Sequence, residues 1–285
     1  GIIGATGNDS VGLAGLAWTT QLMNIRVLSS SRGDSFSLTE GLLYAATNGA
    51  QVLNVSLSSS AQNAMVSAAL EDLETAGIIV VASAGNDGIN TDFFPQYPSA
   101  YDFSNIVSVA ATTSNDELAS FSNYGVTTVD LAAPGAYTPT TTLGADYTVV
   151  SGTSFAAPHV AGTLALYRGL QPELPHTTII RRLLGTTDPI ASLDGIVASG
   201  GRLNAGRLIS LSACEEGRFG YDCAPCSCMH GACDEGLEGT GECTTCEEGW
   251  SGENCSHCAN DFYGVFDEST SCLLAFSGQA NVTER

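Results

Sequence analysis

The chain has 285 residues, of which 44% are hydrophobic and 14% charged, and it carries a net charge of −21 at pH 7. This composition predicts a globular protein that can bury a large core and still leave room for a second small domain. The acidic balance argues against nucleic acids and anionic membranes as partners, and the sequence contains no apolar run of the about 20 residues that a membrane helix needs.

Residues 1–213 alternate short apolar runs with segments of helical periodicity. We expect strands at residues 25–28, 51–57, 78–82, 106–111 and 129–132. We expect helices from a Ser37–Glu40 capping box to about Asn48, over 62–76 with Gly77 as a left-handed cap, over 154–170 and over 176–184. This alternation predicts an α/β fold, a three-layer parallel sheet with helices on both faces. Ligands of such folds bind at the carboxyl ends of the strands.

Two polar groups are placed for acyl-transfer chemistry. Ser154 begins an apolar helix of small residues between Gly152 and Gly162. The unpaired N–H groups of a helix start suit a developing negative charge. Asn86 supplies a side-chain amide after the apolar run 78–82. A serine nucleophile and an amide donor form half of an acyl-transfer site, while a serine that only caps its helix is the simpler alternative.

The segment 152–162 resembles the serine signature of subtilisin-like serine proteases, and four further stretches agree with that family in order. They are residues 1–28, 54–57, 83–88 and 121–125 followed by 133–135. The resemblance covers about residues 1–210 and implies an N-terminally truncated subtilisin-like domain, because the family's catalytic Asp and His precede the segment that matches Gly1. We therefore expect the chain by itself to be inactive and a longer parent to be active.

The resemblance also implies residue roles for a serine-type endopeptidase. Ser154 would be the nucleophile and Asn86 the oxyanion donor. The extended strip Ser56, Leu57 and Ser58 would pair with the substrate backbone, and Ser83, Ala84 and Gly85 would line the pocket for the substrate side chain. His159 lies five residues after Ser154, about 140° around the helix, so it cannot reach the hydroxyl and is expected to be structural.

Calcium is the one cofactor that the sequence suggests, and we expect no organic cofactor. The loop 7–13 resembles the family's calcium loop. Asp9 would provide a side-chain oxygen, and Gly7, Val11 and Leu13 would provide carbonyl oxygens, which are all hard ligands. An ordinary Asn-Asp turn is the alternative interpretation.

The cysteines mark a second domain. All ten lie between Cys214 and Cys272, so we divide the chain into residues 1–212, 213–272 and a tail, 273–285. A segment this short and rich in cysteine predicts disulfides and an oxidising, extracellular-type compartment. The protein would then be secreted, or would face the outside of a membrane-anchored parent. The cysteines are Cys214, Cys223, Cys226, Cys228, Cys233, Cys243, Cys246, Cys255, Cys258 and Cys272.

Eight of these cysteines, with the glycines and aromatic residues between them, resemble a laminin-type EGF-like repeat. The resemblance implies the pairs 226–233, 228–243, 246–255 and 258–272, and leaves 214–223 as a pair from a partial repeat. The Cys-x-x-Cys spacings leave zinc as an alternative. Such a module would be a spacer or would contact an extracellular protein.

The alternative to a serine endopeptidase is a secreted adhesion or matrix protein, in which a degenerate protease domain is a scaffold and the EGF-like module is a contact surface.

Overall fold

The computed structural model of the chain describes residues 1–29, 32–144, 146–211, 216–220, 224–259, 262–264 and 272–274. It divides into two compact units, Gly1–Ser210 and Leu211–Arg285. Within the described ranges, no helix has the length and apolar character needed to cross a bilayer.

The first unit is built on a six-stranded sheet in the order β3-β4-β5-β6-β10-β9. The strands are β3 (Val52–Val55), β4 (Ile79–Ser83), β5 (Ile106–Thr112), β6 (Leu131–Pro134), β9 (Asp188–Pro189) and β10 (Gly201–Arg202). Neighbours from β3 to β10 are parallel, and only β9 runs antiparallel to its neighbour. Every residue of β4 and β5 is buried, as their mostly apolar sequences, IVVAS and IVSVAAT, predict for strands covered on both faces.

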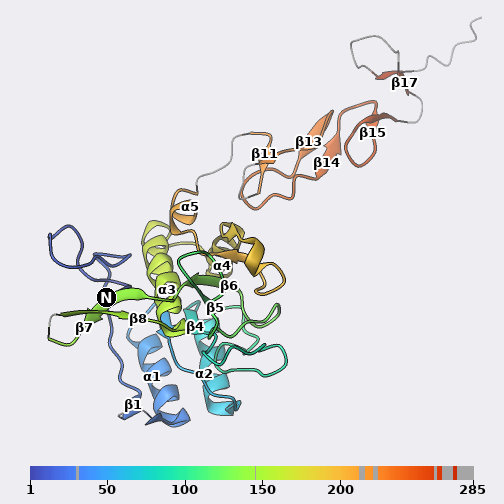
Figure 1. The fold of residues 1–285 in the computed structure, drawn as a ribbon. Helices are drawn as coiled ribbons and strands as arrows, with labels where there is room; N and C mark the ends of the chain where they lie inside the picture. Colours follow the sequence, from blue (N-terminus) through green and yellow to red (C-terminus); the bar gives the residue numbers. More distant parts are fainter. Residues whose placement is uncertain are drawn as a thin grey trace, which may run out of the picture. The chain divides into compact units, whose positions relative to one another are not determined.

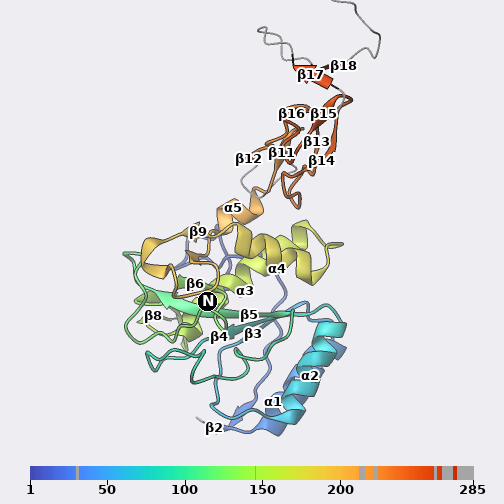
Figure 2. The same cartoon turned by 90° about the vertical axis from the view of Figure 1, so that its right-hand side faces the viewer.

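Helices cover both faces of this sheet (Figure 1; Figure 2). Helices α1 (Ser35–Thr47) and α2 (Ala64–Thr75) pack on one face, against Leu53, Val80 and their neighbours. Helices α3 (Thr153–Leu170) and α4 (His176–Gly185) pack on the other, against Val81 and Val109. The short helices are α5 (Ala205–Ile209) and the 3-10 turn η1 (Ala191–Leu193). The predicted three-layer α/β architecture is confirmed.

Two local predictions were wrong, and one hairpin was not predicted. Helix α1 is capped by Asp34, whose Oδ1 accepts from the backbone N–H of Ser37 at 2.8 Å, so the Ser37–Glu40 capping box lies inside the helix. A carboxylate is a strong cap because it also meets the positive end of the helix dipole. Of residues 25–28, only Leu28 is in a strand, in β1 (Leu28–Ser29) beside β2 (Arg32–Gly33). The threonine-rich hairpin β7 (Thr138–Thr142) and β8 (Asp146–Val150) has no apolar period and was not predicted.

One largely buried carboxyl group makes stability depend on pH. Burial raises the pKa of Asp130 to about 6, although its Oδ2 accepts from the N–H of Ser108 at 2.7 Å. The folded state therefore holds this proton more tightly than the unfolded state, and the free energy of unfolding falls as pH rises from about 4 to about 6. The variant Asp130→Asn keeps an acceptor for Ser108 but cannot titrate. We predict that it reduces the pH-dependent decrease in the free energy of unfolding by about 1–3 kcal/mol.

Urea denaturation between pH 4 and pH 7.5 measures this effect. The exposed carboxylate Asp102, changed to asparagine, is the control and should leave the dependence unchanged. An equal pH dependence in Asp130→Asn and the parent chain would show that Asp130 does not carry it.

The second unit is a series of short antiparallel ribbons. They are β11 (Arg218–Phe219) with β12 (Ala224–Pro225), β13 (Gly231–Cys233) with β14 (Cys243–Cys246), β15 (Trp250–Ser251) with β16 (His257–Cys258), and β17 (Phe262–Gly264) with β18 (Cys272–Leu274). The rings of His230 and Trp250 stack with centroids 3.6 Å apart.

Three disulfides join Cys226 to Cys233, Cys228 to Cys243, and Cys246 to Cys255. These are three of the pairs that the laminin-type resemblance implies. Cys243 and Cys246 belong to different disulfides, so the zinc alternative fails for this Cys-x-x-Cys pair. Cys214 and Cys223, and the side chains of Cys258 and Cys272, lie outside what the structure describes.

Candidate active site

Ser154 is the second residue of α3, at the end of the sheet where β3 and β4 finish. The helix follows Gly152, whose φ of 153° is a conformation that L side chains rarely adopt. Ser154 is partly buried, while the next two positions that face the core, Ala156 and Ala157, are fully buried. Glycine at the turn and alanines on the inner face therefore let the serine sit at an open helix start.

Asn86 reaches this helix start from the loop after β4. Its Oδ1 accepts two hydrogen bonds from Thr153, one from the backbone N–H at 2.8 Å and one from Oγ1 at 3.0 Å. Oγ1 of Thr153 in turn accepts from the N–H of Gly85 at 3.2 Å. The carboxamide oxygen is thereby fixed, and its Nδ2 has no hydrogen-bond partner in the described part of the chain. Asn86 and the residue before Ser154 are thus in direct contact.

Asn123, which is fully buried, holds the loop that carries Asn86 through hydrogen bonds of its side chain. Its Oδ1 accepts from the N–H groups of Asp87 at 2.9 Å and Ile89 at 3.1 Å, and its Nδ2 donates to the carbonyl of Ala84 at 3.0 Å. A side chain at Gly85 would overlap Nδ2 of Asn123, which explains the glycine there. Asn123 lies within the stretch 121–125 that carries the family resemblance, but the local sequence offers no signal for this role.

Pro158 frees the backbone carbonyl of the candidate nucleophile. In a regular helix, the N–H of residue 158 would donate to the carbonyl of Ser154, but proline has no N–H. The hydroxyl of Ser56 takes its place and donates to that carbonyl at 3.1 Å. This bond ties the end of β3 to the start of α3. The proline inside the predicted helix was a signal for such a partner, although it does not identify Ser56.

Ser56→Ala should therefore lower the free energy of unfolding by about 1 kcal/mol, because the carbonyl of Ser154 loses its donor. Urea denaturation measures the change. Ser58, which is exposed and makes no hydrogen bond within the described residues, gives the matched control Ser58→Ala. Equal stability of the two variants would show that the Ser56 bond contributes nothing.

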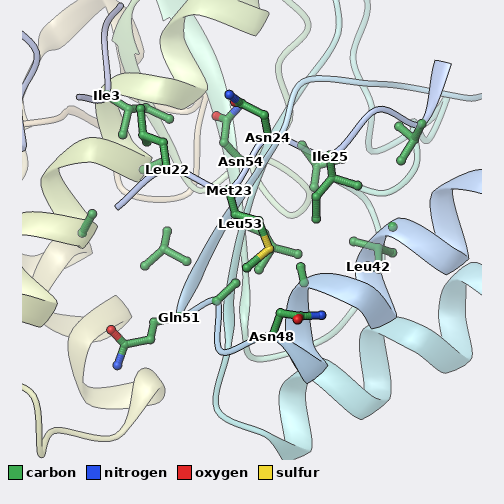
Figure 3. A pocket seen from close by; sticks show the side chains of 18 of the residues that line it. Ile3, Leu22, Met23, Asn24, Ile25, Leu42, Asn48, Gln51, Leu53 and Asn54 are labelled. Atoms are coloured by element: carbon green, nitrogen blue, oxygen red, sulfur yellow. The ribbon is translucent and has the colours of Figure 1, made fainter. Parts of the chain in front are cut away.

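The predicted substrate strips border the same place. Ser56, Leu57 and Ser58 continue β3 beyond Val55. Ser83, Ala84 and Gly85 are buried, and both backbone groups of Ala84 are already paired, its N–H with the carbonyl of Val109 and its carbonyl with Asn123. A cavity of about 1050 Å³ borders Ser56 and Leu57, but Ser154 and Asn86 do not line it (Figure 3).

Neither histidine of the first unit contacts Ser154. Nδ1 of His159 lies 2.8 Å from the carbonyl oxygen of Phe155 in its own helix, and burial lowers the pKa of its imidazole. His176 begins α4, and its Nε2 lies 3.3 Å from Oγ of Ser104. Desolvation likewise lowers the pKa of His176. The structural role expected for His159 agrees with these contacts, and the site contains no base for Ser154 among its described neighbours.

The loop 7–13 forms a turn in which Oδ1 of Asp9 accepts from the N–H of Val11 at 3.0 Å. Asp9 is the loop's only carboxylate, and calcium takes six to eight oxygen ligands. The described residues contain no cluster of three His, Cys, Asp or Glu side chains that could hold a metal. Gly7, Asp9, Val11 and Leu13 do not by themselves complete a calcium site, so no chemical step is assigned to calcium.

A family model and several known proteins match the first unit of the chain. The model of the subtilase family, peptidase S8, matches residues 1–208. Thermitase of Thermoactinomyces vulgaris is 38% identical over 206 residues, which cover 72% of this chain and 71% of thermitase. A thermophilic serine proteinase of Bacillus sp. (strain AK1) is 37% identical over 206 residues, and the chain spans only 49% of its length.

A solved structure supports the fold independently. A protease of Pseudoalteromonas arctica PAMC 21717 superposes with a TM-score of 0.65 and 28% identity, over 74% of this chain and 68% of that protein.

Proposed function

Because the chain belongs to the subtilase family, we propose that it is the part of a serine endopeptidase that carries the nucleophile, Ser154, and the oxyanion donor, Asn86. The observation that carries the proposal is the contact between the Asn86 carboxamide and Thr153, which fixes an amide donor next to the serine. The alternative of a capping serine does not fit, because the N-cap of α3 is Gly152 and Ser154 is the second residue of the helix. The substrate would be a polypeptide.

The mechanism follows from the positions of these groups. The Ser154 hydroxyl attacks the carbonyl carbon of the scissile peptide and gives its proton to a base. The carbonyl oxygen becomes negative as the tetrahedral intermediate forms. Nδ2 of Asn86 and the backbone N–H of Ser154 would donate to that oxygen, since both are fixed before the substrate binds. The protonated base gives its proton to the leaving nitrogen as the intermediate collapses, which expels the amine and leaves an acyl group on Ser154. Water then hydrolyses this acyl group and regenerates the serine hydroxyl.

The base and its carboxylate partner would come from polypeptide outside this chain. His159 is held by Phe155 and His176 by Ser104, so neither can take the serine proton. We therefore propose that the 285-residue chain alone does not hydrolyse peptides. Residues 56–58 would pair with the substrate as an added strand, and residues 83–85 would form the floor of its side-chain pocket.

Labelling with a fluorophosphonate, which reacts with activated serines, tests this proposal. The chain alone should not be labelled. A chimera in which the thermitase residues that precede the aligned region are joined ahead of Gly1 should be labelled on Ser154 and should cleave a peptide. The Ser154→Ala variant of this chimera should do neither. Labelling of the chain alone at the rate of the chimera would overturn the missing-base proposal. A chimera that melts cooperatively but is never labelled would overturn the assignment of Ser154.

For the second unit we propose a laminin-type EGF-like module outside the cell. The three described disulfides support this proposal because their pairing is the one that the resemblance implies and because disulfides persist in oxidising compartments. The module would be a spacer or a contact surface for an extracellular protein.

A further inference from the structure

The second unit carries a glycosylation motif in an exposed turn. In secreted proteins, N-linked glycans are attached to the asparagine of the sequence Asn-x-Ser/Thr. This chain contains the motif at Asn8, Asn54, Asn254 and Asn281. Asn281 lies outside the described residues. The other three have different surroundings in the fold, so the structure distinguishes between them.

The motif at Asn54 is engaged in the fold. Asn54 belongs to β3, and its Nδ2 donates to Oγ of Ser56 at 3.0 Å. The Ser56 hydroxyl in turn donates to the carbonyl of Ser154 at 3.1 Å. Both polar side chains of the motif therefore have partners. A glycan on Nδ2 would also stand beside the residues that are proposed to pair with the substrate, so this motif is a poor acceptor.

The side chain of Asn254 is free to be modified. Asn254 lies in the turn 252–255 between β15 and β16 (Figure 2), where its side chain is exposed and has no hydrogen-bond partner in the described part of the chain. Its backbone carbonyl accepts from the N–H of Met229 at 3.1 Å, so the turn itself is fixed. A glycan on Nδ2 would displace no interaction of the fold. Asn8 is likewise exposed, and its motif contains no cysteine.

The middle residue of the Asn254 motif is a disulfide cysteine. Cys255 is fully buried, has a φ of 49° and is bonded to Cys246, nine residues away. Oγ of Ser256, the third residue of the motif, lies 3.1 Å from Nδ1 of His257. Once the disulfide has closed, the backbone of the motif is held in this turn. It can then no longer adapt to the site of a modifying enzyme.

We propose that Asn254 carries an N-linked glycan and that closure of the Cys246–Cys255 disulfide limits the fraction of chains that receive it. Nδ2 of Asn254 bonds to C1 of the first sugar, the bond from C1 to a pyrophosphate oxygen breaks, and the amide releases one proton. The co-reactant is a sugar chain carried on a polyprenyl pyrophosphate, which is the leaving group.

The disulfide competes with this transfer because it closes a short loop. The two cysteines are nine residues apart, and the entropic cost of closing a loop is smaller for a shorter loop. Disulfides form within seconds to hours, depending on the oxidant. Oxidation and sugar transfer therefore act on the same flexible segment before the unit has folded. The inference rests on the extracellular module proposed above and not on the catalytic proposal.

Secretion of the full 285-residue chain from mammalian cells tests the proposal. A peptide N-glycosidase in heavy-oxygen water converts each glycosylated asparagine to a labelled aspartate, and mass spectrometry of the chain from cells and medium gives the labelled fraction at each motif. We expect label at position 254 and none at position 54. Ser256→Ala removes the hydroxyl that the motif requires and should abolish the label at 254.

Two cysteine variants test the role of the disulfide. Cys246→Ser leaves the Asn254 motif intact but prevents its disulfide, and it should raise the labelled fraction there at least twofold. Cys228→Ser is the matched control, because it breaks the neighbouring disulfide to Cys243 and keeps the one in the motif. It should change the labelled fraction little. Label at Asn8 should respond to neither variant.

Three results would overturn the proposal. One is no label at position 254 in either the parent chain or Cys246→Ser. Another is an equal labelled fraction in the two cysteine variants, and the third is as much label at position 54 as at 254. Disulfide mapping of the same samples separates this proposal from the extracellular module. If the parent chain has the Cys246–Cys255 bond but position 254 is never labelled, the module stands and the glycan proposal fails. If these thiols stay free, both proposals fail.

Discussion

Asn86→Leu should lower kcat of the thermitase chimera about 100- to 1,000-fold, with KM little changed. An oxyanion donor acts on charge that exists only in the transition state, and removing one typically costs about 2.7–4 kcal/mol of barrier stabilisation. Peptide hydrolysis at saturating substrate measures the loss of kcat. Because leucine also removes the acceptor for the two Thr153 bonds, the melting temperature must be measured in parallel.

A second pair of variants separates donation from positioning. Asn86→Asp keeps an oxygen for Thr153 and removes the Nδ2 donor, so it should lose at least as much activity as the leucine variant. Thr153→Val removes the Oγ1 bonds to Asn86 and to the N–H of Gly85 but keeps the backbone bond to Asn86, and it should cost about tenfold or less. If Asn86→Asp retained most of the activity, the role of Asn86 would be to position the helix start, and the oxyanion assignment would be wrong.

The elements that the sequence predicted well are those whose surroundings are the same on both faces. The first four residues of β4 are apolar, as a strand buried on both faces requires, and its bounds, Ile79–Ser83, differ from the predicted 78–82 by one residue. Helix α3 was predicted to within one residue because its buried residues recur with a helical period. The fold class follows from the order of such segments.

What local sequence could not predict depends on contacts between distant residues. Residues 25–28 have the composition of a strand, but a strand also needs a neighbour, and among the described residues only Leu28 has one, in β2. The bond from Ser56 to Ser154 joins residues 98 positions apart. Of the candidate site, Ser154 and Asn86 were identified through a family resemblance, while the contacts that orient them, through Thr153, Ser56 and Asn123, required the structure.

Asn123→Ala should have the largest effect on stability of any single change in the site, lowering the free energy of unfolding by about 3 kcal/mol. The side chain is fully buried, and its loss leaves the N–H groups of Asp87 and Ile89 and the carbonyl of Ala84 without their partners. Each unmet buried group costs about 1–3 kcal/mol, and relaxation of the exposed part of the loop toward water offsets some of the sum. The measurement is urea denaturation at constant pH.

The same substitution should also release the loop that carries Asn86. Its carboxamide would then need to be ordered when the substrate binds, so kcat of the thermitase chimera should fall with stability, even under conditions where the variant is folded. Asn115→Ala is the matched control, because Asn115 is exposed in a turn and its side chain has no partner among the described residues. A folded Asn123→Ala chimera with unchanged kcat would show that Thr153 alone holds Asn86 in place and that the buried clamp serves only the fold.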